Sequence, residues 1–336
     1  MIEIIDILKK FQTGYDEKNT QNITAFMDEL FSDRQDLLTL GTNTWEVCLG
    51  SDEVTKLIHD DWNGSWGDFK IDMATVKIDV DGSVAWFYAD CTLKYKFKDA
   101  DEKAFERYNK QVREIIANEN ATPKQRLSFL NWVFGLHFHQ RTPSEREYLW
   151  PSEFNGMLIQ ENDKWKIATL HFAAAKPSYP SVRFEDTVEN YEAITDAMRK
   201  KMMAHNGNKA DSELVDFLKE TEKSLQFNSD QIAVFTAGHF SWVMALVTEK
   251  KSISEDEIFE KSLSEIEDVL NSNLSEEEKL FSSKRNIAYA LKEVASGATY
   301  TWVVRLTAVV EKTENGYKVR NKHLSYPFPW LLEGIY

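Results

Sequence analysis

The spacing of hydrophobic residues divides the chain into helices and strands. Up to residue 203, apolar residues recur at helical spacing in six segments, and alternating or continuously apolar runs mark the strands. The predicted helices are 2–14, 22–31, 51–62, 101–118, 123–138 and 188–203. The predicted strands are 37–41, 45–48, 69–80, 83–97, 148–160 and 164–173. Asp81-Gly82 predicts a tight hairpin turn, so the pattern indicates an α+β fold with an antiparallel sheet.

The second half of the chain repeats most of this order from about residue 211 onwards, without a counterpart of the short strands at 37–48. It predicts a helix, a hairpin through Ala237-Gly238, helices at 255–271 and 275–292, and strands at 299–311 and 316–325. Four landmarks, namely Gly82, Trp86, Trp150 and His171, recur as Gly238, Trp242, Trp302 and His323. The separation drifts only from 156 to 152 residues across the unit. Because chance similarity would not preserve such spacing, we infer a tandem duplication, with one domain at 1–180 and a diverged second domain at 185–336.

Neither copy of the aromatic strand has a polar face. The two faces of the first copy carry Val84, Trp86 and Tyr88 on one side and Ala85, Phe87, Ala89 and Cys91 on the other. An antiparallel strand of this kind needs cover on both sides, since exposed apolar area costs ~25 cal/mol per Å². We expect helices to cover one side and the sheet of the other copy to cover the second, giving a monomer with an internal pseudo-dimer.

Composition narrows the possible partners. The 336 residues include 40 basic and 55 acidic ones, for a net charge of −15, which disfavours binding to nucleic acid. No apolar run approaches the ~18 residues of a membrane span, and the N-terminal segment lacks the pattern of a signal peptide. We therefore expect a cytoplasmic protein with no membrane partner. Two isolated cysteines and the absence of the usual metal and nucleotide motifs predict no metal and no cofactor.

Four segments carry a resemblance to a known family: 40–42, 50–54, 82–87 and 163–171, the last reading Asp-Lys-Trp-Lys-Ile-Ala-Thr-Leu-His. With them the chain resembles the SnoaL-like branch of the nuclear transport factor 2-like superfamily, with a helical insertion near 101–145. The resemblance implies two cone-shaped domains, each a curved antiparallel sheet wrapped around helices. It also implies a pocket at the open end of a cone, but it does not select one function.

The resemblance also suggests acid–base residues. His171 matches a histidine on the last strand of this branch, and Asp61 beside Trp62 matches a polar–aromatic pair; Tyr88 is a further candidate. An imidazole titrates near neutral pH, and an apolar setting raises the pKa of a carboxyl group. The alternatives are a buried structural histidine at 171 and a solvated helix end at Asp61.

Aromatic residues of the first copy suggest a ligand pocket. The candidate ligand-binding residues are Trp45, Trp62, Trp66, Trp86, Tyr88, Trp150 and His171. They could bind a flat or apolar small molecule, or they could simply pack in the core. Three hypotheses follow: a binder of a small apolar or aromatic ligand in the first cone, a protein-interaction module, and an isomerase, cyclase or dehydratase that uses His171 with Asp61 or Tyr88.

Overall fold

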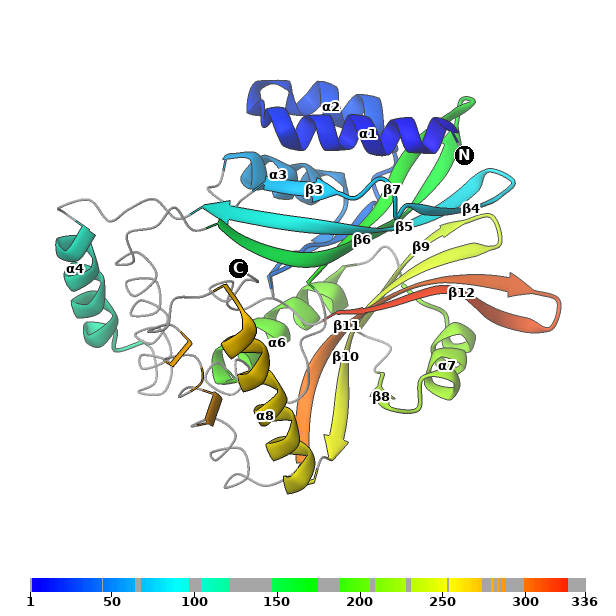
Figure 1. The fold of residues 1–336 in the computed structure, drawn as a ribbon. Coiled ribbons are helices and arrows are strands. Elements are labelled where there is room, and N and C mark those ends of the chain that lie inside the picture. Colours follow the sequence, from blue (N-terminus) through cyan, green and yellow to red (C-terminus); the bar gives the residue numbers. More distant parts are fainter. Residues whose placement is uncertain are drawn as a thin grey trace.

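The computed structural model describes most of residues 2–325. The gaps are residue 44 and the segments 64–67, 97–103, 121–146, 175–187, 206–208, 228–230, 253, 274–278, 281–282, 284–285 and 288–298. The described part is an α+β structure with two sheets, the first of which curls into a half-barrel (Figure 1). Among the described residues, no helix is both long and apolar enough to cross a membrane.

The first sheet has seven strands in the order β2-β1-β7-β6-β5-β3, with β4 paired to β5. Its strands are β1 Leu38–Leu40, β2 Val47–Leu49, β3 Asp68–Ile71, β4 Lys77–Asp81, β5 Val84–Lys96, β6 Glu147–Glu161 and β7 Lys164–Ala174. The helices α1 (Ile2–Glu17), α2 (Ile23–Leu30) and α3 (Ser51–Asn63) lie on its concave face (Figure 1). Phe11 of α1 stacks on Phe154 of β6, with ring centroids 5.2 Å apart, so α1 forms the centre of this core.

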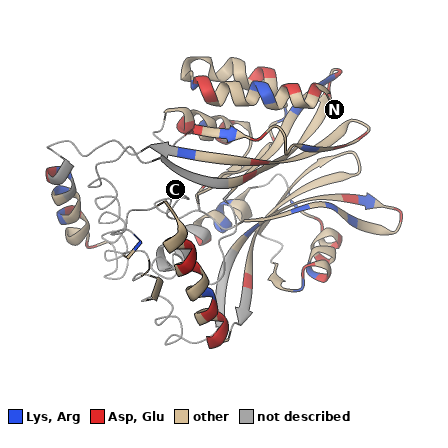
Figure 2. Ribbon diagram, in the orientation of Figure 1, with Lys and Arg blue, Asp and Glu red and all other residues tan. Residues whose placement is uncertain are grey.

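The second sheet has five strands in the order β12-β11-β10-β8, with β9 paired to β10. Its strands are β8 Leu225–Gln226, β9 Ile232–Ala237, β10 Phe240–Ser252, β11 Thr299–Thr313 and β12 Gly316–Ser325. The remaining helices are α4 Ala104–Ala117, α6 Val188–Ala204, α7 Ser212–Thr221 and α8 Glu255–Asn271. Helix α7 and Ile258 of α8 pack on one face of the second sheet. Figure 2 shows that α8 carries many acidic residues.

The two sheets share their strand pairing in detail. Strands β8 to β12 pair with one another as β3 to β7 do. Trp86 lies opposite Met157, and Trp242 lies opposite Val309 in the matching register. Each outer pair contains an irregularity at the same place, directly after Met157 in β6 and after Val309 in β11.

The faces of the two sheets that point away from their own helices pack against each other. Trp86 of β5 contacts Phe240 of β10, with ring centroids 5.2 Å apart. Trp242, Met244 and Leu246 belong to the same buried cluster as the core of the first sheet. The described parts of β5 and β10 therefore have cover on both sides, as their two apolar faces require.

Two expectations about the elements need correction. The predicted strand 69–80 is interrupted by a turn, in which Thr75 N donates to Asp72 O at 3.0 Å, and becomes β3 and β4. The layer between the sheets is also less apolar than predicted, because it contains buried His171, Thr307 and Arg305. Predicted helix 123–138 and much of the insertion lie outside the described residues.

Candidate functional site

A cavity opens in the first half-barrel between the helices and the concave face of the sheet. Its volume is about 70 Å³, enough for several water molecules or part of a small ligand. Its lining combines apolar and polar residues: Tyr15, Lys18, Gly41, Thr42, Asn43, Glu46, Leu57, Asp61, Phe69, Cys91, Leu93, Ser152, Glu153 and Phe172.

A hydrogen-bonded pair of ionisable side chains, Tyr15 and Asp61, lines this cavity. Tyr15 lies one helical turn after Phe11 on the buried face of α1, and Asp61 lies in the last turn of α3. The Tyr15 hydroxyl donates to Asp61 Oδ2 at 2.8 Å. The Trp62 ring packs edge-on against the Tyr15 ring, at 6.1 Å between centroids, and holds it in place.

The surroundings of this pair change its protonation. Burial, with the nearby Glu46 carboxylate, raises the pKa of Asp61 to about 7, although the Tyr15 hydrogen bond opposes that rise. Burial and the Asp61 charge raise the pKa of Tyr15 well above its ordinary value. A carboxyl group that titrates near neutrality can accept or donate a proton within one site.

Between β1 and β2, the described residues Gly41, Thr42, Asn43 and Glu46 form the rim of the cavity. Glu46 accepts hydrogen bonds from Asn43 N and Asn43 Nδ2, each at 2.7 Å. A Cβ atom on Gly41 would lie 2.6 Å from Glu46 Cβ, so this position requires glycine. Arg305, from β11 of the second sheet, donates to Thr42 O at 2.9 Å. The second sheet therefore helps to position the rim of a cavity in the first.

His171 does not lie in this cavity. On β7 it points to the side opposite Phe172, which lines the cavity, because successive strand residues face opposite ways. His171 is fully buried between the two sheets. Its Nδ1 lies 2.8 Å from Thr307 Oγ1, and its Nε2 lies 2.9 Å from Ser325 Oγ. The structure thus separates His171 from Asp61, which were expected to act together.

The hydrogen bonds around His171 fit a neutral ring. The Thr307 hydroxyl donates its hydrogen to Asn155 Oδ1 at 3.3 Å, so its oxygen accepts a hydrogen bond from His171 Nδ1–H. His171 Nε2 then carries no proton and accepts from the Ser325 hydroxyl. Burial is the main reason that the pKa of His171 lies well below its ordinary value, and the nearby His323 and Arg305 lower it further. These contacts connect β7 of the first sheet with β11 and β12 of the second.

The other predicted residues are spread over several places. The Tyr88 ring faces His323 of the second sheet, with centroids 6.1 Å apart, and its hydroxyl donates to Asp90 Oδ1 at 2.6 Å. Trp86 packs between the sheets, and Trp62 packs behind Tyr15. Trp45 is 56% exposed beside the rim residue Glu46. Trp66 and the side chain of Trp150 lie outside the described part of the chain.

Sequence reasoning missed Tyr15 and Glu46. The signal for Tyr15 was available, because Ile4, Leu8, Phe11 and Tyr15 continue one helical stripe. Glu46 lies in an irregular loop whose path the local pattern does not determine.

Comparison with known proteins supports the fold of the first part of the chain. Residues 6–111 match the family model described as "SnoaL-like domain". No curated protein matches the chain in sequence.

Several solved structures resemble the chain. An NTF-2 like protein of unknown function from Shewanella oneidensis has 14% identity and a TM-score of 0.30, covering 51% of this chain and 95% of its own. A nuclear transport factor 2 (NTF2-like) superfamily protein from Salmonella enterica has 11% identity and a TM-score of 0.34, covering 53% and 93%. A protein of unknown function from Mycobacterium tuberculosis has 10% identity and a TM-score of 0.32, covering 58% and 88%.

Proposed function

We propose that the protein binds a small apolar or aromatic molecule in the cavity of the first half-barrel. The observation that carries this proposal is the Tyr15–Asp61 pair, joined at 2.8 Å, beside an apolar lining that includes Leu57, Phe69 and Phe172. Ligand sites commonly combine such a lining with a few fixed polar groups.

The charges of the cavity favour a ligand without a negative charge. Glu46 and Asp61 contribute carboxyl groups to the lining, against one lysine, Lys18. The Glu153 carboxylate instead pairs with His323 Nε2 of the second sheet at 2.6 Å, on the face of β6 opposite Phe154. A neutral ligand with a hydroxyl or carbonyl group could exchange hydrogen bonds with the Tyr15–Asp61 pair, while its ring contacts the apolar side chains. An anion would meet like charges and lose hydration.

We further propose that the chain is a tandem duplication of a SnoaL-like domain, with copies at 1–180 and 185–336, that forms a monomer with an internal pseudo-dimer. The matching registers of Trp86 and Trp242 support this, as do the irregularities at equivalent places in β6 and β11. Helices α1 and α3 contribute Tyr15, Leu57 and Asp61 to the lining of the cavity, and we assign the ligand to the first copy alone.

Acid–base catalysis is the second candidate function. It is favoured by Asp61, whose pKa of about 7 suits a proton-transfer group at neutral pH. In such an isomerase, cyclase or dehydratase, Asp61 would work with Tyr15 rather than with His171 or Tyr88. The interaction-module hypothesis stays a prediction, because much of the 101–145 insertion lies outside the described residues.

A ligand screen with two matched variants tests the main proposal. We expect neutral aromatic hydroxy or carbonyl compounds to raise the melting temperature, and Tyr15→Phe to weaken their binding about tenfold, because one hydrogen bond contributes ~1 kcal/mol or more. Tyr88→Phe, which makes the same chemical change on the opposite face of the sheet, should leave the affinity unchanged. A screen without a stabilising compound, or equal effects of both variants, would contradict the proposal.

A further inference from the structure

Three hairpins meet at one end of the molecule, far along the chain from one another. The β4–β5, β9–β10 and β11–β12 hairpins all project toward the right of Figure 1. Asp81 ends β4 in the first sheet, His239 lies in the turn before β10, and Glu311 lies on β11. The second sheet supplies two of these side chains and the first sheet supplies one.

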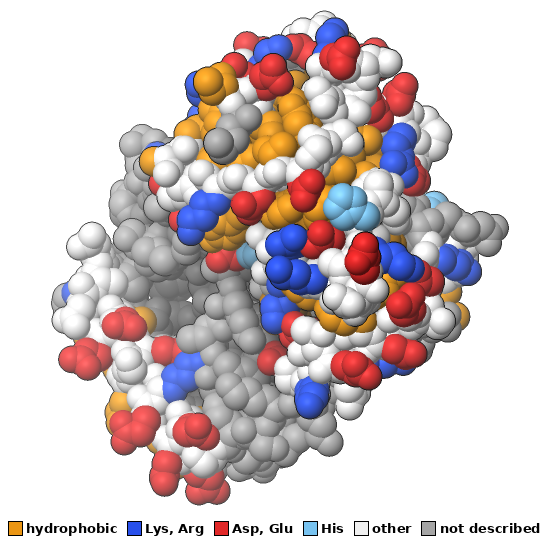
Figure 3. All heavy atoms as spheres, turned by 90° about the vertical axis from the view of Figure 1, so that its right-hand side faces the viewer, with side chains coloured by type: hydrophobic (Ala, Val, Ile, Leu, Met, Phe, Trp, Pro, Cys, Tyr) orange, Lys and Arg blue, Asp and Glu red, His pale blue; other side chains and the backbone are white. Residues whose placement is uncertain are grey.

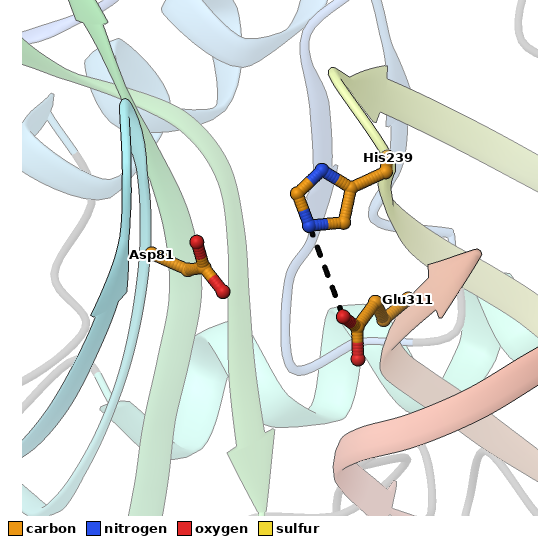
Figure 4. A group of neighbouring side chains, drawn as sticks. All are labelled: Asp81, His239 and Glu311. Carbon is orange, nitrogen blue, oxygen red and sulfur yellow. Dashed lines mark ion pairs between the residues drawn. The ribbon is translucent and has the colours of Figure 1, made fainter. Parts of the chain in front are cut away.

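Their side chains converge. The nearest ligand atoms of Asp81, His239 and Glu311 all lie within 4.8 Å of one another, and His239 Nε2 is 3.8 Å from Glu311 Oε1 (Figure 4). Tetrahedral ligands about 2.0–2.1 Å from a zinc ion lie roughly 3.4 Å apart. Small rotations of the exposed Asp81 and His239 side chains would therefore bring all three to ligand distance.

The backbone holds this arrangement in place. Lys312 N donates to His239 O at 2.7 Å, which ties the β9–β10 turn to β11 beside Glu311. The His239 ring packs on Phe240, with centroids 4.3 Å apart. The His239 side chain is nevertheless 52% exposed, and the hairpin ends in Figure 3 carry acidic and basic side chains at the surface. The imidazole is therefore accessible from solvent.

One neighbour competes for the carboxylate. Arg320 contacts Glu311 Oε2 through Nε at 2.7 Å and through a terminal nitrogen at 2.6 Å. The other oxygen, Oε1, faces His239. Arg320 thus lowers the negative charge of the group and keeps Glu311 oriented, while one oxygen remains directed at the histidine.

We propose that Asp81, His239 and Glu311 bind a divalent transition-metal ion, with Zn²⁺ as the best match, and that the ion links the ends of the two sheets. One imidazole and two carboxylates are ligands that Zn²⁺ accepts, with water completing the coordination. The site is separate from the Tyr15–Asp61 cavity, and its ion is a structural link between hairpins. The three residues are far apart in the sequence and form no local motif, which is why the sequence predicted no metal.

Titration of the full chain with ZnCl₂, followed by calorimetry, tests this site. We expect one ion per chain and a higher melting temperature, since binding only to the folded state stabilises it. His239→Gln and Asp81→Asn should each weaken binding at least tenfold. His59→Gln is the matched control, because His59 is also exposed and lies 3.5 Å from a carboxylate, that of Asp60, but belongs to no such group of three among the described residues.

Loss of Zn²⁺ binding in a variant could also result from misfolding, so a variant that should bind Zn²⁺ more tightly is needed. Arg320→Gln removes the competing cation, and we expect it to increase the affinity for Zn²⁺ several-fold. Binding that is equal in the wild type, His239→Gln and Asp81→Asn would overturn the proposal. A stoichiometry of zero, or an affinity that Arg320→Gln lowers, would also overturn it.

Discussion

Replacing Asp61 with asparagine is expected to raise the free energy of unfolding at pH 8 by up to about 4 kcal/mol. The pKa of Asp61 rises from 3.8 to about 7 on folding, and each pKa unit corresponds to ~1.4 kcal/mol. At pH 8 the folded wild type must hold a buried negative charge that the variant lacks. The asparagine oxygen can still accept the hydrogen bond from Tyr15.

The sign of the pH dependence follows from proton binding. Between pH 3.8 and 7 the unfolded chain has lost the Asp61 proton, whereas the folded protein retains it. The folded state then binds more protons, so this group lowers stability as the pH rises through that window. Relative to Asp61→Asn, the wild type should lose stability from about pH 4 to pH 7 and change little above about pH 8.

Denaturant unfolding at several pH values measures this difference. Asp60→Asn is the matched control, because Asp60 is exposed, pairs with Lys56, and has a lowered pKa. The control should not stabilise the protein at pH 8. If Asp61→Asn is less stable than the wild type at every pH, the Asp61 charge supports the fold and our account of the cavity is wrong.

Replacing His171 with alanine is expected to lower the free energy of unfolding by about 3 kcal/mol at pH 7.5. The substitution leaves a void and removes a hydrogen-bond partner from both Thr307 and Ser325, which are buried. Ligand binding in the cavity should change little, because His171 faces away from it. His59→Ala, at an exposed histidine, should cost less than about 0.5 kcal/mol.

Lowering the pH should reduce the difference in free energy of unfolding between the wild type and His171→Ala. Since the pKa of His171 in the folded protein lies well below its ordinary value of 6.5, the unfolded chain takes up a proton below pH 6.5 while the folded chain does not. Wild-type stability then falls by ~1.4 kcal/mol per pH unit relative to His171→Ala. Unfolding curves from pH 7.5 to pH 5 measure this change. A gap that widens on acidification would mean that His171 is charged in the folded state.

Much of the fold could be predicted from the sequence, because the patterns that indicate its elements are local. Neighbouring residues are enough to predict the hairpin at Asp81-Gly82 and the strand that begins at Val84. They also show that the strand around Trp86 has apolar residues on both faces. The buried contact between Trp86 and Phe240 shows that the second face of β5 is covered by the other sheet.

The site was harder to predict from the sequence, because it depends on which face of a strand each residue occupies. The family resemblance suggested His171, but the alternation set by Phe172 places His171 between the sheets. Asp61 does line the cavity, although its partner is Tyr15, 46 residues away. Arg305 contacts the rim loop from 263 residues away, and no local pattern contains such a contact.

Our central claim is that the two sheets pack face to face within one chain. A double-mutant cycle of Trp86→Leu and Phe240→Leu tests it most directly, because their ring centroids are 5.2 Å apart on opposite sheets. We predict a coupling free energy of about 1 kcal/mol that is independent of protein concentration. Additive effects, or a coupling that disappears on dilution, would contradict the claim.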